Sequence, residues 1–421
     1  MASQKTMPTP WILPSKKTLT LPPTSMGVRE AQPVPANWRR PLLPVLASLS
    51  LALGLELGLV LPARTAPTVL ARVTVAAEPG RFLAWPANNG IWSWDGGREL
   101  LVGFHDGPWQ EKEGHKVGHP QVQRLARSLD GGRSWQQETP SPYVGREGAP
   151  MPLLKPIRFD DPDLAIRVVA DGKGTAQDRL GRFFVSRNRG RSWQGPFRFE
   201  GLEGTPELRD LILTSRTAVR PTGANGAQFL LSARDPRLRR HSNRLDKTFV
   251  AETRDGGRRF RFVSWVVPWS DPYRAVMPSL VDLGDGRLVV ALRRRDPRAP
   301  EDTPSWIDAY ASGDGGRSWR FLSRVGQTGA HNGNPAALAR LRDGRLAATY
   351  ANRSQRAMVL RLSDDEGRSW GPPLLLRANP SNLDMGYPQM AVNDRGELVV
   401  IYYLATAERP HSFLEATVVK P

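Results

Sequence analysis

Arginine occupies one matching position in two similar segments of the chain. Arg295 and Arg353 each stand ten residues after the aspartate of a D-G-R-L turn, Asp285 and Asp343. The planar guanidinium group of arginine can bind a carboxylate through two parallel hydrogen bonds. If the two segments are equivalent units of one fold, both arginines lie at the same end of that fold and can bind one ligand. Alternation along a strand places Arg293 on the same side as Arg295.

Two further arginines extend this pattern. Arg356 lies three residues after Arg353 and could take its place, and Arg234 precedes another turn at a similar position. The alternative interpretation is a basic rim that binds no ligand.

Three histidines and three acidic residues share the short segment 105–119. They are His105, Asp106, Glu111, Glu113, His115 and His119. Such side chains can bind a metal ion, but this spacing matches no standard zinc pattern. We therefore expect a solvated polar loop and no metal site. The sequence also lacks a nucleotide-binding glycine-rich turn, so no cofactor is expected.

One eight-residue turn motif recurs five times and marks the units that carry these side chains. The copies occupy 128–135, 186–193, 253–260, 312–319 and 363–370. Aspartate at the third position, or asparagine in the second copy, can accept hydrogen bonds from backbone N–H groups. Glycine at the fifth position permits a positive φ, and the final aromatic residue starts the next strand. The intervals of 51–67 residues predict repeated four-stranded antiparallel units.

A second recurring sequence pattern predicts the first strand of several units. Segments that begin at Trp85, Met277, Asn334 and Tyr387 each pass a proline and then read as strand, turn and strand. Counting gives six units, near 80–140, 150–200, 208–265, 275–325, 333–376 and 385–421. The last unit needs a strand from 411–420 or from 69–77, which would remove an exposed sheet edge. We therefore expect an all-β fold, a six-bladed β-propeller of four-stranded antiparallel blades, over 67–421.

Residues 1–66 form a basic N-terminal segment that includes the apolar run 41–63. Positive charge followed by an apolar run predicts a signal peptide or a membrane anchor. The run is near the roughly 20 residues that span a bilayer, although Glu56 weakens a stable span. We expect export to the periplasm, the medium or the outer side of a membrane. The chain start could be Met1 or Met26.

The composition limits the partners. The chain has no cysteine, which excludes disulfides and thiolate metal sites. Its net charge of +18 fits either a solvated surface or attraction to an acidic partner. No nucleic-acid-binding pattern accompanies the charge. We expect a glycan partner, carboxylated, no nucleic acid, and a monomer.

The turn motif S-x-D-x-G-x-x-W is the Asp box, or BNR repeat, and roughly residues 80–421 resemble the sialidase superfamily. Longer stretches are similar to bacterial exo-α-sialidase-like proteins. Among these stretches are AWPANNGIWSW, MPSLVDLGDGRLVVALRRRD and LDMGYPQMAV. The resemblance implies a β-propeller that cleaves a terminal sugar. It also implies a tyrosine nucleophile activated by a glutamate, an arginine clamp for the sugar carboxylate, and an aspartate acid and base.

Residue by residue, the resemblance implies Tyr387 as the nucleophile. It implies Arg295 and Arg353 as the clamp, with Arg293 as the alternative to Arg295. Trp85, together with Trp92, would stack on the sugar.

Three positions depart from the family pattern. Ala84 stands where an arginine is expected, Met277 where the glutamate is expected, and His119 near the expected aspartate. Arg81 is the nearest arginine to the first of these positions. Asp106, 25 residues after Arg81, is the nearest substitute for the acid, with Glu111 and Glu113 as alternatives. Two functions follow: an exported glycoside hydrolase, or a non-catalytic propeller that binds an anionic glycan or an envelope protein.

Overall fold

Antiparallel strands make up nearly all the regular structure that the computed structural model describes. The described residues are 66–138, 148–169, 179–237, 245–300, 302–330 and 332–421. Within them the helices are three short 3-10 turns, η1 (Pro86–Asn88), η2 (Asp95–Gly97) and η3 (Pro206–Leu208). The predicted all-β fold is confirmed.

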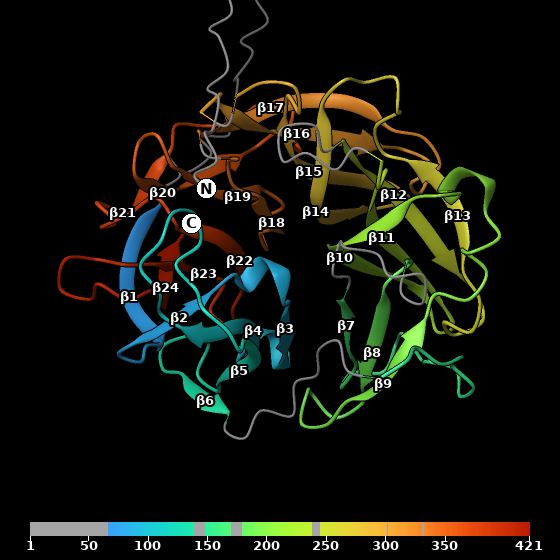
Figure 1. The fold of residues 1–421 in the computed structure, drawn as a ribbon, viewed down its shortest axis with the longest axis horizontal. Coiled ribbons are helices and arrows are strands. Elements are labelled where there is room, and N and C mark those ends of the chain that lie inside the picture. The colour runs from blue at the N-terminus through green and yellow to red at the C-terminus, as the bar shows by residue number, and fades with distance from the viewer. Residues whose placement is uncertain (1–65, 139–147, 170–178, 238–244, 301, 331) are drawn as a thin grey trace, which may run out of the picture. The chain divides into compact units, whose positions relative to one another are not determined.

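The strands form five hydrogen-bonded sheets (Figure 1). One holds β1 (Thr68–Ala76), β24 (Phe413–Lys420), β23 (Leu398–Leu404) and β22 (Gly386–Val392). A second holds β2 (Arg81–Ala84), β3 (Ile91–Trp94), β4 (Glu99–Pro108), β5 (Val122–Ser128) and β6 (Gln136–Glu138). A third holds β7 (Ala165–Val169), β8 (Arg182–Ser186) and β9 (Gln194–Arg198). A fourth holds β18 (Ala336–Arg340), β19 (Leu346–Asn352), β20 (Ala357–Ser363) and β21 (Leu374–Ala378).

The fifth sheet has eight strands in two antiparallel runs. The first run is β10 (Ile212–Gly223), β11 (Gly226–Arg234), β12 (Asp246–Thr253) and β13 (Arg261–Trp265). The second is β14 (Arg274–Gly284), β15 (Arg287–Arg295), β16 (Ser305–Ser312) and β17 (Arg320–Gly329). A single parallel pair, Lys247 with Ala275, joins the two runs.

The last sheet in the chain uses both strands that the sequence offered for its completion. β24 pairs with β23, and β1 pairs with the other edge of β24, from Thr68 opposite Lys420 to Ala76 opposite Leu414. A segment near the start of the described chain thus holds its final strand. The apolar run 41–63 lies outside the described residues, and the described part contains no helix long and apolar enough to cross a bilayer.

The first strands of successive antiparallel groups contact one another around a common centre (Figure 1). β7 contacts β10, β10 contacts β14, β14 contacts β18, β18 contacts β22, and β22 contacts β3. Trp92 Nε1 on β3 donates a hydrogen bond to the carbonyl oxygen of Ile166 on β7, at 3.3 Å. These six strands, with η1, line one cavity of about 380 Å³.

The repeated turn has the geometry that its sequence predicts. In the fourth copy, Asp314 Oδ1 accepts hydrogen bonds from the backbone N–H groups of Arg317 and Ser318, both at 2.9 Å. Ser312 Oγ accepts from the backbone N–H of Gly316 at 2.8 Å, and Gly316 has a φ of 85°. The hydroxyl of Ser318 also donates to Asp314 and, with these N–H groups, holds the pKa of that carboxyl at about 2.

Replacing Asp314 with alanine is expected to lower the free energy of unfolding by about 1–2 kcal/mol, because two backbone N–H groups lose their acceptor. Asp314→Asn is expected to cost less. The second copy already uses Asn188, whose Oδ1 accepts from Ser192 N at 2.9 Å. Because the folded pKa is lowered, the contribution of the carboxylate is present above its ordinary pKa of 3.8 and is lost as the pH falls toward about 2. Urea unfolding of both variants measures the effect, and equal losses would contradict this account.

Candidate functional site

Four non-glycine residues that precede a proline have a left-handed backbone; one is Asn379, with a φ of 55°, and the other three pack together. The φ angles of these three are 60° at Trp85, 61° at Met277 and 47° at Tyr387. A residue before proline is normally extended, and a non-glycine residue in this region costs roughly 1–3 kcal/mol. All three side chains pack in one buried cluster. Backbone strain that packing maintains collects at functional sites, which selects this cluster as the candidate site.

Strand pairing explains how Met277 and Tyr387 reach the cluster. The register of β14 against β15 shifts between Val276 and Ser279, and that of β22 against β23 shifts between Gly386 and Gln389. At each shift the strained residue leaves the regular pairing. The backbone N–H of Tyr387 instead donates to Oδ1 of Asn334 at 2.7 Å, which fixes the head of β22.

Arg293 is the arginine that reaches the tyrosine. Its Nη1 lies 3.3 Å from the phenolic oxygen of Tyr387 and 3.5 Å from the sulfur of Met277. Arg293 is 4% exposed and Tyr387 6%. A guanidinium group that donates to a phenolic oxygen stabilises negative charge on that oxygen. The arrangement therefore suits a tyrosine that reacts as a nucleophile.

The two other predicted clamp arginines lie in different surroundings. Nη2 of Arg353 donates to the carbonyl oxygen of Met385 at 3.4 Å, close to Tyr387 along the chain. Arg295 donates to Oδ1 of Asn332 at 3.1 Å. These hydrogen bonds bring Arg293 and Arg353 to the segment that carries the tyrosine, whereas Arg295 bonds to Asn332 on another segment.

The alternatives to these arginines lie elsewhere. Arg356 donates to the carbonyl oxygen of Pro380, and Arg234 ends β11 opposite Asp246.

A histidine, a carboxylate and a second tyrosine extend the cluster. His115 Nδ1 lies 2.9 Å from Asp384 Oδ1, and the hydroxyl of Tyr403 donates to the same oxygen. The backbone N–H of Lys116 donates to Asp384 Oδ2 at 3.4 Å. The rings of Tyr403 and Tyr387 lie 6.3 Å apart.

The charges of this group support one another. Burial works against the charged form of both His115 and Asp384 and is the largest single effect on each pKa, but their mutual hydrogen bond and charge attraction, with smaller contributions from neighbouring groups, together outweigh it. As a result the pKa of His115 is raised and that of Asp384 is lowered. Burial raises the pKa of Tyr403 well above its ordinary value, so this hydroxyl remains a donor.

Asp106, predicted as the acid, lies in different surroundings. It is 0% exposed and is held between Arg81, at 2.7 Å, and Arg124. The carboxylate of Asp106 is thus held in a buried double ion pair, and its role as the acid stays a prediction. Arg81 is engaged by this ion pair. Of the alternatives, Glu111 forms an ion pair with Lys116, and Glu113 is exposed.

Trp85 lies between two histidines. Its ring meets the ring of His115 edge-on, with centroids 4.8 Å apart, and that of His105 at 5.2 Å. Asn89 Nδ2 lies 2.8 Å from Nδ1 of His105. Trp85 is thus a neighbour of the polar cluster, whereas Trp92 lines the cavity. That either ring stacks on a sugar stays a prediction.

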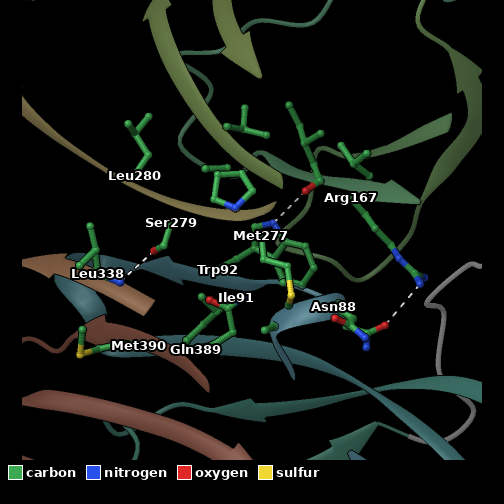
Figure 2. A pocket seen from close by; sticks show the side chains of 18 of the residues that line it. Asn88, Ile91, Trp92, Arg167, Met277, Ser279, Leu280, Leu338, Gln389 and Met390 are labelled. Carbon is green, nitrogen blue, oxygen red and sulfur yellow. Dashed lines mark hydrogen bonds between the residues drawn. The ribbon is translucent and has the colours of Figure 1, made fainter. Parts of the chain in front are cut away.

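The cavity and the polar cluster are adjacent but distinct. Figure 2 shows Met277, Gln389 and Arg167 around the cavity. Met277 lines this space and also contacts Arg293, so it forms the boundary between the two. Tyr387, Asp384 and the clamp arginines do not line it. The chemistry-bearing side chains therefore lie at the strand heads and not along the cavity.

Sequence reasoning missed Asp384 and Tyr403, and it placed His115 only in a polar loop. The available signal was an aspartate three residues before Tyr387, because both would share the head of one strand. Within the described residues, no group of three or more His, Asp or Glu side chains could hold a metal ion.

Comparison with known proteins identifies the repeat. A family model described as BNR repeat-like domain matches residues 107–400, more than half of the chain. This confirms the predicted resemblance to the Asp-box superfamily. None of the curated proteins compared with the chain matches its sequence.

Solved structures share the fold at low identity. A protein of unknown function from Dyadobacter fermentans has a TM-score of 0.63 and 18% identity, covering 84% of this chain and 99% of that one. An α-L-arabinanase from Penicillium chrysogenum, complexed with arabinobiose, has a TM-score of 0.52 and 13% identity, covering 83% and 98%. A mutant sialidase from Trypanosoma rangeli has a TM-score of 0.48 and 12% identity, covering 84% and 59%.

Proposed function

The chain belongs to the BNR repeat-like domain family, and from this premise we propose that it is an exported glycoside hydrolase. It removes a terminal, carboxylated sugar, with Tyr387 as the nucleophile and Arg293 and Arg353 as cationic groups of the site. The α-L-arabinanase from Penicillium chrysogenum, which has the same fold, is a precedent for glycoside cleavage on this scaffold.

The observation that carries the proposal is the contact between Arg293 Nη1 and the phenolic oxygen of Tyr387, 3.3 Å, inside a strained and buried cluster. A tyrosine in its neutral phenol form does not repel the carboxylate of an incoming acidic sugar, whereas an ionised aspartate or glutamate nucleophile would. Arginine near the phenolic oxygen also attracts the sugar carboxylate. Both features favour an acidic substrate.

We also propose a six-bladed propeller as the architecture. The single parallel pair between β12 and β14 supports reading the eight-stranded sheet as two blades. The contacts between successive first strands support a ring around one cavity. A crystal structure with a different number of blades would reject this architecture.

Export rests on the basic segment followed by the apolar run 41–63. Fractionation of cells that produce the full chain tests it: recovery of the protein only in the cytoplasm would reject export.

A binding protein without catalysis is the second candidate. It is favoured by Met277 at the position of the expected glutamate and by the complete burial of Asp106. Such a protein would bind an anionic glycan in a salt-sensitive manner and leave it intact.

A panel of glycosides distinguishes the two candidates. The full-length protein is incubated with 4-methylumbelliferyl α-sialoside, β-glucuronide and α-L-arabinofuranoside, and released fluorophore is measured. We expect turnover of a carboxylated glycoside in preference to the neutral arabinoside. Salt-sensitive binding of an anionic glycan with no release from any substrate would reject the hydrolase and support the binding protein.

A further inference from the structure

The ion pair of His115 and Asp384 has the form of an oriented proton-transfer pair. Asp384 engages Nδ1 of the imidazole at 2.9 Å, and its carboxylate is itself fixed by the hydroxyl of Tyr403 and the backbone N–H of Lys116. A carboxylate on Nδ1 sets the tautomer and the ring orientation, and it leaves Nε2 to exchange a proton with a substrate.

The members of the cluster differ in solvent exposure, and this difference indicates different roles. The side chain of His115 is 48% exposed, whereas that of Asp384 is 6% exposed. Tyr387 and Arg293 are also almost fully buried. Among these groups, solvent reaches the imidazole. The leaving group of a glycoside departs toward solvent, so the group that protonates its oxygen must stand on that side.

A short hairpin-like loop holds the imidazole in place. Trp109 and Val117 pair across it, and the backbone N–H of Gln110 donates to the carbonyl oxygen of Lys116 at 3.1 Å. The ring of His115 then rests against Trp85. The histidine is thereby carried from a distant part of the chain to the head of β22.

We propose that His115 is the proton donor and acceptor of the hydrolytic reaction and that Asp384 is its positioning residue. This inference rests on the proposed function. It assigns to a histidine the task that the sequence pattern had suggested for a carboxylate such as Asp106.

The reaction then balances in two steps. In the first, His115 Nε2–H protonates the glycosidic oxygen as its bond to the anomeric carbon breaks. The phenolate of Tyr387, whose proton has passed to solvent, bonds to that carbon. In the second step, neutral His115 takes a proton from water as the water oxygen bonds to the anomeric carbon. The electron pair of the broken bond returns to Tyr387 as phenolate beside Arg293.

The expected pH dependence follows from the groups around the imidazole. Burial and Arg353 lower the pKa of His115, whereas Asp384 and Tyr387 raise it, with a net increase above 6.5. The side chain of neighbouring Lys116 is paired with Glu111. The acid form is present below the raised pKa. kcat/KM should therefore fall as the pH rises through that value.

The test compares leaving groups. His115→Gln is expected to lower kcat/KM about 100-fold for an alkyl glycoside of the cleaved sugar, because its leaving oxygen requires a proton. For the 4-methylumbelliferyl glycoside, a good leaving group, the loss should be less than about tenfold, and the alkaline limb of the pH profile should disappear. His119→Gln, an exposed histidine on the same segment, is the matched control and should leave both substrates unaffected.

A second variant covers the case in which His115→Gln does not fold. Asp384→Asn keeps the side-chain size and removes the charge that raises the pKa of His115, so the alkaline limb should move to lower pH. An unchanged limb would overturn the pairing.

The remaining outcomes separate this inference from the proposed function. An active wild-type protein whose His115→Gln variant loses the alkyl and aryl substrates equally, with the same pH profile, would overturn the role of His115 alone. A wild-type protein that cleaves no glycoside overturns the hydrolase and the role of His115 together.

Discussion

Tyr387→Phe is expected to lower kcat/KM for the cleaved glycoside on the order of 10³-fold or more, because it removes the oxygen that attacks the anomeric carbon. The loss should be similar for alkyl and aryl leaving groups. A nucleophile is needed whatever departs, which distinguishes this variant from His115→Gln. Steady-state rates of fluorophore release, with circular dichroism to verify folding, measure the effect.

The Tyr387→Phe variant is expected to fold, because phenylalanine keeps the ring that packs in the buried cluster. The substitution removes the phenolic oxygen to which Arg293 donates. Tyr310→Phe is the matched control, because Tyr310 on β16 is 7% exposed, against 6% for Tyr387, and packs in a different buried cluster. Retention of more than about a tenth of the wild-type kcat/KM by Tyr387→Phe would show that the tyrosine is not the nucleophile.

The turn motif was predictable because its bonds are local. Ser312, Asp314, Gly316 and Ser318 contact one another within one eight-residue turn. Five copies then indicate repeated strand units without any knowledge of long-range contacts. The repeated proline-led strands also placed Tyr387 at the head of the last unit, whereas its role as the nucleophile came from the resemblance to the sialidase superfamily and stays a prediction.

The polar partners of Tyr387 were not predictable in the same way. His115 and Asp384 are 269 residues apart in the chain, and neither stands in a repeated motif. They come together only in the folded chain, where the loop between β4 and β5 contacts the segment that precedes β22. Spacing selected Asp106 as an acid, but it did not reveal that Arg81 pairs with this carboxylate. It could not reveal that Arg124 closes the other side and that the carboxylate has no exposed surface.

The choice among the clustered arginines shows a further limit. Counting from Asp285 favoured Arg295, whereas the contact with Tyr387 is made by Arg293. The reason lies in the partner strand. Arg293 is opposite Val276, next to the strained Met277, while Arg295 is opposite Arg274. Alternation along a strand predicts the side to which a residue points. Which residue of β15 reaches the tyrosine depends instead on where the neighbouring strand β14 pairs irregularly, and the sequence pattern does not show this.

Arg293→Lys is expected to lower kcat/KM for a carboxylated glycoside by about 10²–10³-fold, the cost of removing one donor aimed at developing charge. Lysine keeps the positive charge but loses the planar fork, and its ammonium group does not reproduce contacts to the tyrosine oxygen and to a carboxylate together. The loss should exceed that of Arg295→Lys. Rates of the three variants, including the exposed Arg320→Lys as a control, provide the comparison.

The substrate dependence of this variant is the more informative measurement. If Arg293 acts on both the phenolate and the sugar carboxylate, the preference for a carboxylated over a neutral glycoside should shrink in Arg293→Lys as the overall rate falls. If it acts on the phenolate alone, both substrates should slow equally. An Arg293→Lys variant with wild-type rates on both would remove the contact at 3.3 Å from the mechanism, and with it the observation on which the assignment of Tyr387 depends.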